Sequence, residues 1–436
     1  LPMTEPSLET IIPETGFSDL IRGVAGGFAN FSSSLLVSSE ECWPKRFYFR
    51  LHLEADELEV QLDDYGARYN SVFCLLTELT ASIRGFAAAG LSLTHLSKRV
   101  GDYGIGRSLD SGAELQLREG LEQARAFVQR SICTFIEAWF AECESREFAI
   151  ERGTASPPTL PPAHRFRLPR DLGHEELSDE SQRIAEVASK YLQAVEMLEA
   201  SGLHEELDAK SRWKLLQSGC TEQIARVFEA TVHNLQSAYD TFIGNTLVER
   251  EDARLKQLRG HISTVLHLLG AVTHLTHFVE RHESGQKVDV VDIPLSKLVD
   301  RDEVQDLILN KLMAGALAVI RAGVPLAEEL LPRYTDMATL TVELPEHLSL
   351  HARPASLIVA IATFHGTPVV MEIGESTASA SSILEVMVLV GSNADSRVFR
   401  FLGDSKPLDD IRCLFESGLG EEGLEKLPPQ LSYLAR

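Results

Sequence analysis

The chain has 436 residues, of which 44% are hydrophobic and 24% charged, and its formal net charge at pH 7 is −23. This composition argues against a fibrous or largely disordered chain, and the negative charge disfavours non-specific binding to nucleic-acid phosphate and to anionic lipid. The six cysteines lie singly, which favours reduced thiols over a disulfide framework or a metal site. No run of about 18 apolar residues occurs, and the best shorter run, Met313–Ile320, is too brief to cross a bilayer. We therefore expect a cytoplasmic protein of roughly two to four domains, without membrane insertion or a cofactor.

The first long element predicted is a helix that follows a mixed segment, residues 1 to about 45. Its apolar residues alternate spacings of four and three, with one step missing at Gly90, as in the a/d seam of a helical bundle or coiled coil. They are Leu58, Leu62, Tyr65, Tyr69, Val72, Leu76, Leu79, Ile83, Phe86 and Leu93. The pattern predicts one helix over residues 58–93, about 54 Å long. The glycine-containing loop at residues 101–106 should end this stretch.

A second helix is predicted over residues 111–147, and a proline-rich segment follows it. Five of the 18 prolines lie between Pro157 and Pro169. Because proline lacks a backbone donor and fixes φ, residues 152–173 are predicted to form an extended linker. This linker separates a first helical half, residues 1–151, from a second half, residues 174–333.

The second half repeats the three-and-four spacing at residues 184–198, 228–242 and 255–279. A shorter helix is predicted at about 301–321 and a last turn near 325–331. The long seams carry more apolar surface than solitary helices can hide, which predicts either an intramolecular bundle or an intermolecular coiled coil. Tyr65, Tyr69 and Tyr239 suit a bundle interior better than a two-stranded coil. The seams also make a homo-oligomer an expected outcome.

After Thr335 the periodicity changes to the alternation typical of strands. Strands are predicted at residues 340–344, 367–373, 377–380 and 397–402. Helices are predicted at residues 353–364, 382–390 and about 407–416. The order β-α-β-β-α-β-α within residues 338–427 predicts an α+β domain, with helices on one face of a largely antiparallel sheet.

The segment Ser349–Ala355 contains the most informative chemistry. His351 directly precedes a predicted helix whose first turn contains Pro354, and we expect Pro354 at the first helical position. The N–H groups of that turn have no partner within the helix and favour an anion, and Arg353 adds a permanent positive charge. An imidazole at this place can accept a phosphoryl group. The alternative is that His351 only caps the helix.

Leu350-His-Ala-Arg-Pro-Ala355 resembles the active-site signature of HPr, the histidine-containing phosphocarrier of the bacterial sugar phosphotransferase system. Residues 378–389 resemble the second segment of that family, where a regulatory serine opens the second helix. The resemblance covers residues 338–427. It implies that these residues adopt the HPr-like open-faced sandwich, and that a large all-α bundle or coiled-coil region precedes it.

The resemblance also implies a role for each matching residue. His351 matches the phosphorylated histidine, and Arg353 matches the arginine that supports the phosphate. Ser382 matches the serine that a dedicated kinase, HPr kinase/phosphorylase, modifies in many bacteria. The apolar patch that docks partner proteins corresponds to Ile383, Leu384 and Met387.

Three features depart from the family. Ser349 replaces the usual glycine before the Leu-His pair, and Glu385 stands where a small or basic residue is usual. Basic residues that often help docking are also missing from the first helix. Residues 338–427 contain 13 acidic and 6 basic residues, a net charge of −7. Because enzyme I, the usual phosphoryl donor, is acidic where it meets HPr, we expect weaker docking or a divergent enzyme I-like donor.

Two other groups of residues are candidate sites. Five of the 14 histidines lie between His261 and His282, and the heptad pattern turns His267, His274 and His277 away from the seam. A structural or partner-facing role is favoured over phosphotransfer or metal binding, since no accompanying motif is present. Residues 101–106 contain GxxGxG but follow a helix, which argues against a dinucleotide site.

These observations predict a phosphocarrier or regulatory protein of the phosphotransferase system. It would accept phosphoryl on His351 from an enzyme I-like donor and pass it on to an acceptor, or signal by its phosphorylation state. One alternative is a regulatory adaptor that binds partners through the docking face and Ser382. Another is a fused enzyme whose site lies in the helical region. A phosphoryl carrier forms a phosphohistidine intermediate without being a stand-alone enzyme, so whether the chain is an enzyme stays open.

Overall fold

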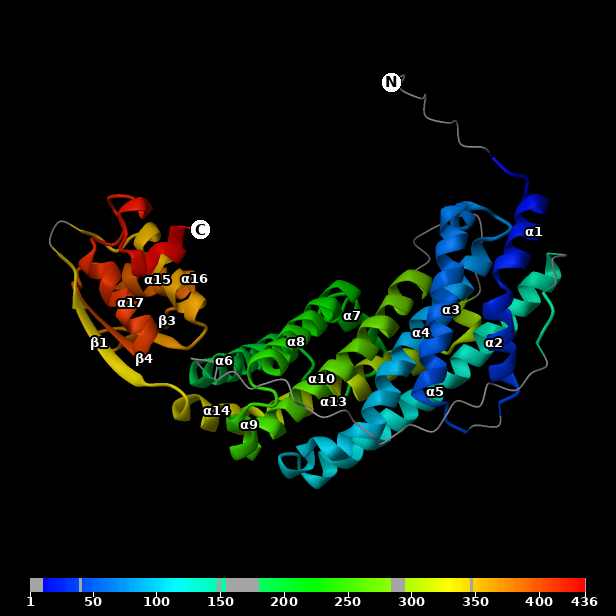
Figure 1. Cartoon of the computed structure of the whole chain (residues 1–436), viewed down its shortest axis with the longest axis horizontal. Helices are drawn as coiled ribbons and strands as arrows, with labels where there is room; N and C mark the ends of the chain where they lie inside the picture. The colour runs from blue at the N-terminus through cyan, green and yellow to red at the C-terminus, as the bar shows by residue number, and fades with distance from the viewer. Residues whose placement is uncertain are drawn as a thin grey trace, which may run out of the picture. The chain divides into compact units, whose positions relative to one another are not determined.

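The computed structural model describes residues 11–38, 41–146, 150–153, 180–283, 295–345 and 348–435. The protein is mostly helical, with a small C-terminal antiparallel sheet of four strands interleaved with helices (Figure 1). The chain divides into two compact units. The first comprises Leu1–Asp171, Met197–Val232 and Ser263–Ala322, and the second comprises Leu172–Glu196, His233–Ile262 and Gly323–Arg436. The first unit therefore takes residues from both predicted helical halves. The predicted linker 152–173 lies outside the described residues, except for its first two residues.

Helices make up the described part of the chain before the sheet. The first unit contains α1 (Glu14–Val24), α2 (Gly26–Leu36), α3 (Lys45–Asp64), α4 (Cys74–Arg99), α5 (Ser111–Ser145), α7 (Ala209–Leu216), α11 (Leu295–Leu298), α12 (Arg301–Asp306) and α13 (Ala314–Ala322). A π-helical stretch, Leu307–Met313, joins α12 to α13. Both units receive residues from α6 (Glu180–Glu199), α8 (Glu222–Phe242) and α10 (Ala253–Phe278), and α9 (Leu247–Glu251) and α14 (Val324–Arg333) belong to the second.

The single helix predicted over residues 58–93 is wrong, because the chain breaks between α3 and α4. Helix α4 begins at Cys74, and Asn70 holds the turn before it: its Oδ1 accepts hydrogen bonds from the backbone N–H groups of Val72 and Phe73, at 2.8 and 3.3 Å. The break turns two seam residues outward, with Tyr65 50% exposed and Tyr69 90% exposed. Tyr239, by contrast, is fully buried as predicted. Helices α1 and α2 lie within residues 1–45, the segment whose mixed pattern predicts no particular element.

The step missing from the seam at Gly90 has a structural cause. The ring of Tyr48, on α3, lies where a side chain at position 90 would project, and its atoms would overlap with a Cβ there. Tyr48 is only 1% exposed, so the ring has no free space into which to move. The glycine therefore permits the close packing of α3 against α4.

Replacing Gly90 with alanine is expected to destabilise the first unit by about 1–3 kcal/mol, because the added methyl group forces Tyr48 out of its position. Gly85 provides a matched control in the same helix, since a Cβ at Gly85 meets nothing within 4 Å. Gly85→Ala should leave stability unchanged or raise it by up to about 1 kcal/mol. Urea unfolding of both variants measures the difference, and equal stabilities would contradict this account of Gly90.

Helix α10 is a core element, and its histidines do not face solvent as a group. His261 is fully buried, together with the polar residues Thr264 and Thr276. Two helical stretches, Ala253–Arg281 and Arg301–Arg333, are long and apolar enough to cross a membrane, although neither is an uninterrupted apolar run. Of their apolar windows, 78% and 56% are buried inside the protein. Buried core helices meet the same criterion of length and hydropathy, so this finding is weak evidence for a membrane span.

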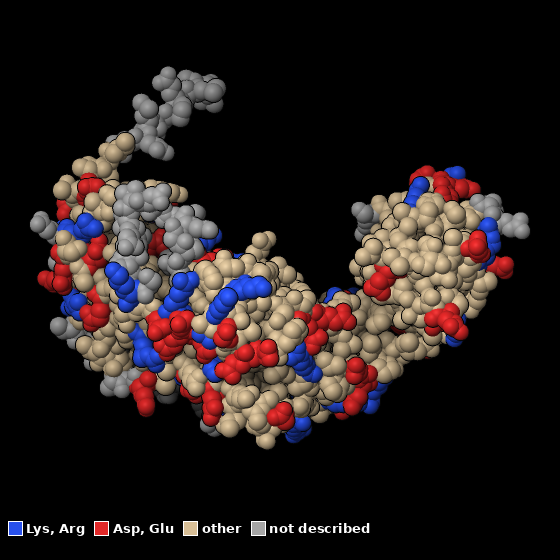
Figure 2. All heavy atoms as spheres, turned by 180° about the vertical axis from the view of Figure 1, so that it is seen from behind, with Lys and Arg blue, Asp and Glu red and all other residues tan. Residues whose placement is uncertain are grey.

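Charged side chains of both signs are mixed over the face of the helices that Figure 2 shows. Many pair with a neighbour one helical turn away, as Arg118 pairs with Glu114 at 2.7 Å on α5. Such exposed pairs contribute only about 0.3–0.5 kcal/mol each. The stability of the helical region therefore rests on its apolar core rather than on these ion pairs.

The C-terminal domain has the predicted order of elements. These are β1 (Met337–Glu343), α15 (Ala352–His365), β2 (Val369–Ile373), β3 (Ser376–Ser379), α16 (Ile383–Ser392), β4 (Val398–Asp404) and α17 (Ser405–Glu416). The strands are antiparallel in the order β1-β4-β2-β3, with Phe401 of β4 opposite both Leu340 and Met371. These three side chains are buried in one core with Ile358 of α15 and Ile411 of α17. The sheet and these helices therefore share one hydrophobic core.

Candidate functional site

His351 lies at the N-terminal end of α15, where it is the N-cap residue. Its Nδ1 accepts the backbone N–H of Arg353 at 3.4 Å, and its side chain is 50% exposed. Helix α15 begins at Ala352, so Pro354 is the third helical residue. The prediction that Pro354 is the first helical residue is therefore wrong. Pro354 still lies in the first turn, whose N–H groups have no partner within the helix. His351 is thus a helix cap, which was the alternative interpretation, but this role leaves its ring accessible.

The second ring nitrogen of His351 has a carboxylate partner. Glu421 Oε1 lies 2.8 Å from His351 Nε2, and the Glu421 side chain is 32% exposed. In the neutral ring, Nδ1 accepts the Arg353 N–H, so the proton lies on Nε2, beside the Glu421 carboxylate. Nδ1 then keeps a lone pair, directed toward the N-terminal end of α15. The Arg353 N–H thus favours one tautomer of His351.

Sequence reasoning did not find Glu421. It follows α17, in the glycine-containing segment Gly418–Gly423, and lies far from His351 in the sequence. No spacing rule connects the two residues, because the tertiary structure brings them together. The only local signal was an acidic pair, Glu421-Glu422, between glycines.

Arg353 supplies an available positive charge beside His351. Its side chain lies exposed on the first turn of α15. Within the part of the chain that the structure describes, its guanidinium has no ion-pair partner. Arginine remains protonated at any physiological pH and presents several N–H donors to an anion. The first turn of α15 therefore combines the Arg353 amide, which bonds His351 Nδ1, with a permanent cation.

Ser382 caps α16, and Glu385 bonds the end of β3. Ser382 is the N-cap residue, and its Oγ accepts the backbone N–H of Glu385 at 3.4 Å. Glu385 Oε2 accepts the backbone N–H of Ser379 at 3.0 Å. The arrangement differs from a capping box, because the Glu385 carboxylate bonds Ser379 and not the N-cap residue Ser382. Glu385, which departs from the residue expected at its position, therefore has a structural role at the start of α16.

Ser382→Ala is expected to destabilise the C-terminal domain by about 1 kcal/mol, because the helix loses its capping oxygen. Ser382→Asp should be close to neutral, since a carboxylate also caps. Ser381→Ala is the matched control, because the side chain of Ser381 does not cap the helix. Thermal unfolding of the three variants measures these effects. Unfolding of the aspartate variant with the alanine variant intact would contradict the assignment of Ser382 as a regulatory cap.

The predicted docking residues on α16 differ in accessibility. Leu384 is 72% exposed and Ile383 43% exposed, whereas Met387 is partly buried against the domain core. Val388, which sequence reasoning did not name, is 59% exposed. Helices α15 and α16 pack together, so this apolar surface belongs to the same helical layer as His351.

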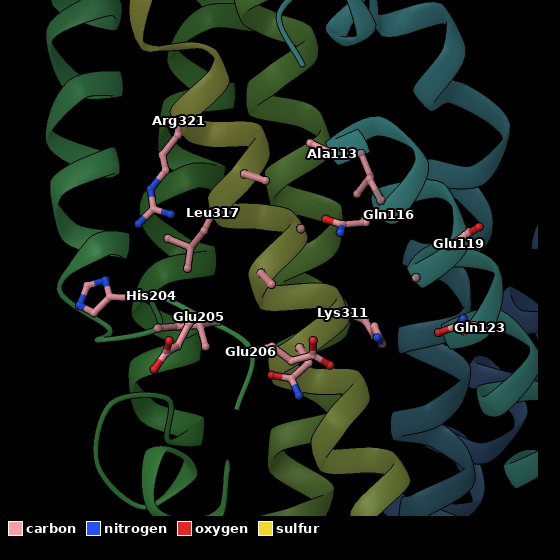
Figure 3. Close-up of a pocket in the computed structure, with 17 residues that line it drawn as sticks. Ala113, Gln116, Glu119, Gln123, His204, Glu205, Glu206, Lys311, Leu317 and Arg321 are labelled. Atoms are coloured by element: carbon pink, nitrogen blue, oxygen red, sulfur yellow. The ribbon is translucent and has the colours of Figure 1, made fainter. Parts of the chain in front are cut away.

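A pocket of about 400 Å³ lies in the first helical unit, away from the residues predicted to form a site (Figure 3). Its lining carries charges of both signs, including Glu205, Glu206 and Lys311. Several of its polar groups hold the protein together: Asn310 bonds both backbone groups of Leu207 at 2.9 Å, and Arg321 pairs with Glu199 at 2.8 Å. The lining does not select one class of ligand.

The histidines of α10 make internal contacts. His277 Nδ1 lies 2.9 Å from Glu222 Oε1 on α8. Burial lowers the pKa of His274 to about 4, and the positive charges of His52, Arg84, Arg226 and His277 lower it further. Among the described residues, no group of three His, Cys, Asp or Glu side chains is arranged to hold a metal ion.

Comparison of the chain with protein-family models, curated proteins and solved structures gives no match. The chemistry that the structure provides in the C-terminal domain is specific nonetheless. It places an accessible imidazole at a helix N-terminus, paired through Nε2 with Glu421, next to the cation of Arg353.

Proposed function

We propose that residues 338–427 are an HPr-like phosphocarrier domain that accepts a phosphoryl group on His351 from an enzyme I-like donor. One observation carries this proposal: Nδ1 of His351 faces the N-terminal end of α15 while Glu421 holds Nε2. Further support comes from the order β-α-β-β-α-β-α and the antiparallel strand order β1-β4-β2-β3. The helices that bury one face of the sheet are consistent with an open-faced sandwich.

In the proposed step, the Nδ1 lone pair of His351 attacks the phosphorus of a phosphohistidine on the donor. The new N–P bond forms as the donor's N–P bond breaks, and the donor imidazole leaves with the bonding electron pair. Positive charge develops on the His351 ring, and the Glu421 carboxylate stabilises it through Nε2–H. The N–H groups of the α15 first turn and the Arg353 guanidinium stabilise the phosphoryl charge. Transfer to an acceptor reverses these steps.

The helical region has a supporting role in this proposal: it positions the carrier domain, self-associates, or responds to the phosphorylation state. A second candidate function is a regulatory adaptor that uses the docking face without phosphoryl transfer. The exposed apolar surface of α16 favours it, with Leu384 72% and Val388 59% exposed. Phosphate on Ser382 would place nearly two negative charges at the start of that surface.

Phosphoryl transfer to the full chain distinguishes the two functions. We expect incubation with phosphoenolpyruvate and a cognate enzyme I-like donor to add one phosphate, seen by intact mass measurement at neutral pH. His351→Ala should add none, while circular dichroism shows the same fold. Failure of every enzyme I-like donor of the source organism to phosphorylate the folded wild-type chain would exclude the carrier function and favour the adaptor.

A further inference from the structure

The C-terminal residues extend beyond the boundary at 427 that the sequence predicted for the last domain. They form two short 3₁₀ helices, η6 (Leu424–Lys426) and η7 (Pro429–Ala435). Leu431 of η7 is fully buried in the same core as the sheet and α15. We call Leu424–Ala435 the C-terminal segment, and its buried leucine makes it an integral part of the domain.

Asp410 of α17 anchors this segment. Its carboxylate receives hydrogen bonds from Gln430 Nε2 at 2.5 Å and from Tyr433 Oη at 2.6 Å. His365 Nε2, at the end of α15, lies 2.8 Å from the same carboxylate. The side chains of Asp410 and His365 are only 7% and 11% exposed. Three side chains, two from η7 and one from α15, thus converge on one buried carboxylate.

Tyr433 adds apolar contact to this anchor. Its ring stacks on Phe364 of α15, with centroids 3.8 Å apart and planes 12° apart. Burial raises the pKa of Tyr433, and the Asp410 carboxylate raises it further, so the hydroxyl stays protonated as a donor. The C-terminal segment is therefore attached to both α15 and α17.

The loop that carries Glu421 lies between α17 and the C-terminal segment. It is short, because α17 ends at Glu416 and η6 begins at Leu424. Gly420 has a φ of +71°, and a Cβ there would meet Leu357 Cδ1 of α15 at 2.8 Å. The loop thus lies directly against α15, and both of its ends are held by anchored elements.

We propose that the C-terminal segment acts as a clamp, whose anchorage on Asp410 holds Glu421 against His351. A loop fixed at both ends loses little further entropy when Glu421 contacts the imidazole. Without the anchor, the same residues are no longer fixed, and ordering them costs more than one half-exposed contact provides. Release of the segment therefore frees His351 Nε2. This inference concerns a contact within the folded chain and holds whether or not His351 carries phosphate.

The rate at which diethyl pyrocarbonate acylates His351 in the full chain tests the clamp. The reagent attacks an unprotonated ring nitrogen. The readout is acylation at Nε2, counted apart from acylation at Nδ1, because the Glu421 carboxylate 2.8 Å from Nε2 hinders reaction at that atom. The double substitution Gln430→Ala with Tyr433→Phe removes two of the three donors to Asp410. It should accelerate acylation of His351 by about three- to tenfold. Lys426→Ala is the control, because Lys426 lies in the same segment and pairs only with the exposed Glu422, at 3.1 Å. It should change nothing.

Two other histidines, read in the same peptide digest, report on the fold. Exposed His204 should react at one rate in every variant, and fully buried His261 should stay protected. If the double variant loses the protection of His261, the single substitution Tyr433→Phe carries the test, since it keeps the ring that stacks on Phe364.

Glu421→Ala decides whether the segment acts through Glu421. This substitution alone should accelerate acylation of His351, and the clamp substitutions should add no further acceleration in its background. Unchanged acylation in a folded clamp variant would overturn the proposal. So would an equal further acceleration in the Glu421→Ala background, because the segment would then act on His351 by another route.

Discussion

Replacing Arg353 with alanine is expected to slow phosphoryl transfer to His351 by about ten- to a hundredfold, because a charge-assisted hydrogen bond to the phosphoryl group, worth about 1.5–3 kcal/mol, is lost. The domain should keep its stability, since the exposed guanidinium makes no ion pair within the described residues. Rapid-quench measurement of transfer from the phosphorylated donor gives the rate, and thermal unfolding gives the stability.

Arg412→Ala is the matched control for this experiment. It removes the same charge from the same domain, but Arg412 lies on α17 and pairs with Asp409 at 2.8 Å. Transfer to this variant should be nearly unchanged. An equal loss of rate in both variants would show that net charge governs docking, and that Arg353 does not act on the phosphoryl group.

Lowering the pH from 7 to 4 is expected to destabilise the first helical unit by about 3 kcal/mol through His274 alone. Burial is the main reason that the folded protein holds the pKa of this histidine near 4, well below the ordinary value of 6.5. Between these two values the unfolded chain binds a proton that the folded chain does not bind. The free energy of unfolding therefore falls as the pH falls from 6.5, and the contribution levels off below about 4.

Urea unfolding at several pH values measures this effect, with His274→Gln as the variant that cannot titrate. The variant should lose much of the pH dependence between 6.5 and 4. The Glu222–His277 contact gives a residual slope: burial raises the pKa of Glu222, but hydrogen bonds from His277 and Arg226 outweigh burial and lower that pKa. His204→Gln, at an exposed position, should keep the full pH dependence. An identical slope in wild type and His274→Gln would contradict the assignment.

The sequence predicted the elements of the C-terminal domain well, because their signals are local. Alternation identified the four strands, and the serine at 382 marked the start of a helix. The helix predicted over residues 58–93 failed for a complementary reason. Heptad spacing continues through Tyr65 and Tyr69 by coincidence, while the side chain of Asn70 holds a turn at the break. Periodicity does not register such a break when the flanking residues are apolar.

The candidate site divides in the same way. His351, Arg353 and Ser382 could be named because each lies within a short motif at a helix start. Glu421 could not, since its contact with His351 depends on the path of the chain after α17. The contact between Tyr48 and Gly90 is another tertiary contact. In the sequence it shows only as an apolar residue missing from the seam at Gly90. Residues that act through tertiary contacts leave little local pattern.

The most direct test of the central claim is the phosphorus NMR spectrum of the full chain after incubation with phosphoenolpyruvate and the enzyme I-like donor. The account predicts one phosphoramidate resonance, with the chemical shift of phosphate on Nδ1 of histidine, since Glu421 holds Nε2. The signal should disappear in mild acid and be absent from His351→Ala. A phosphate ester stable to acid, or no phosphoramidate on a folded chain, would contradict it.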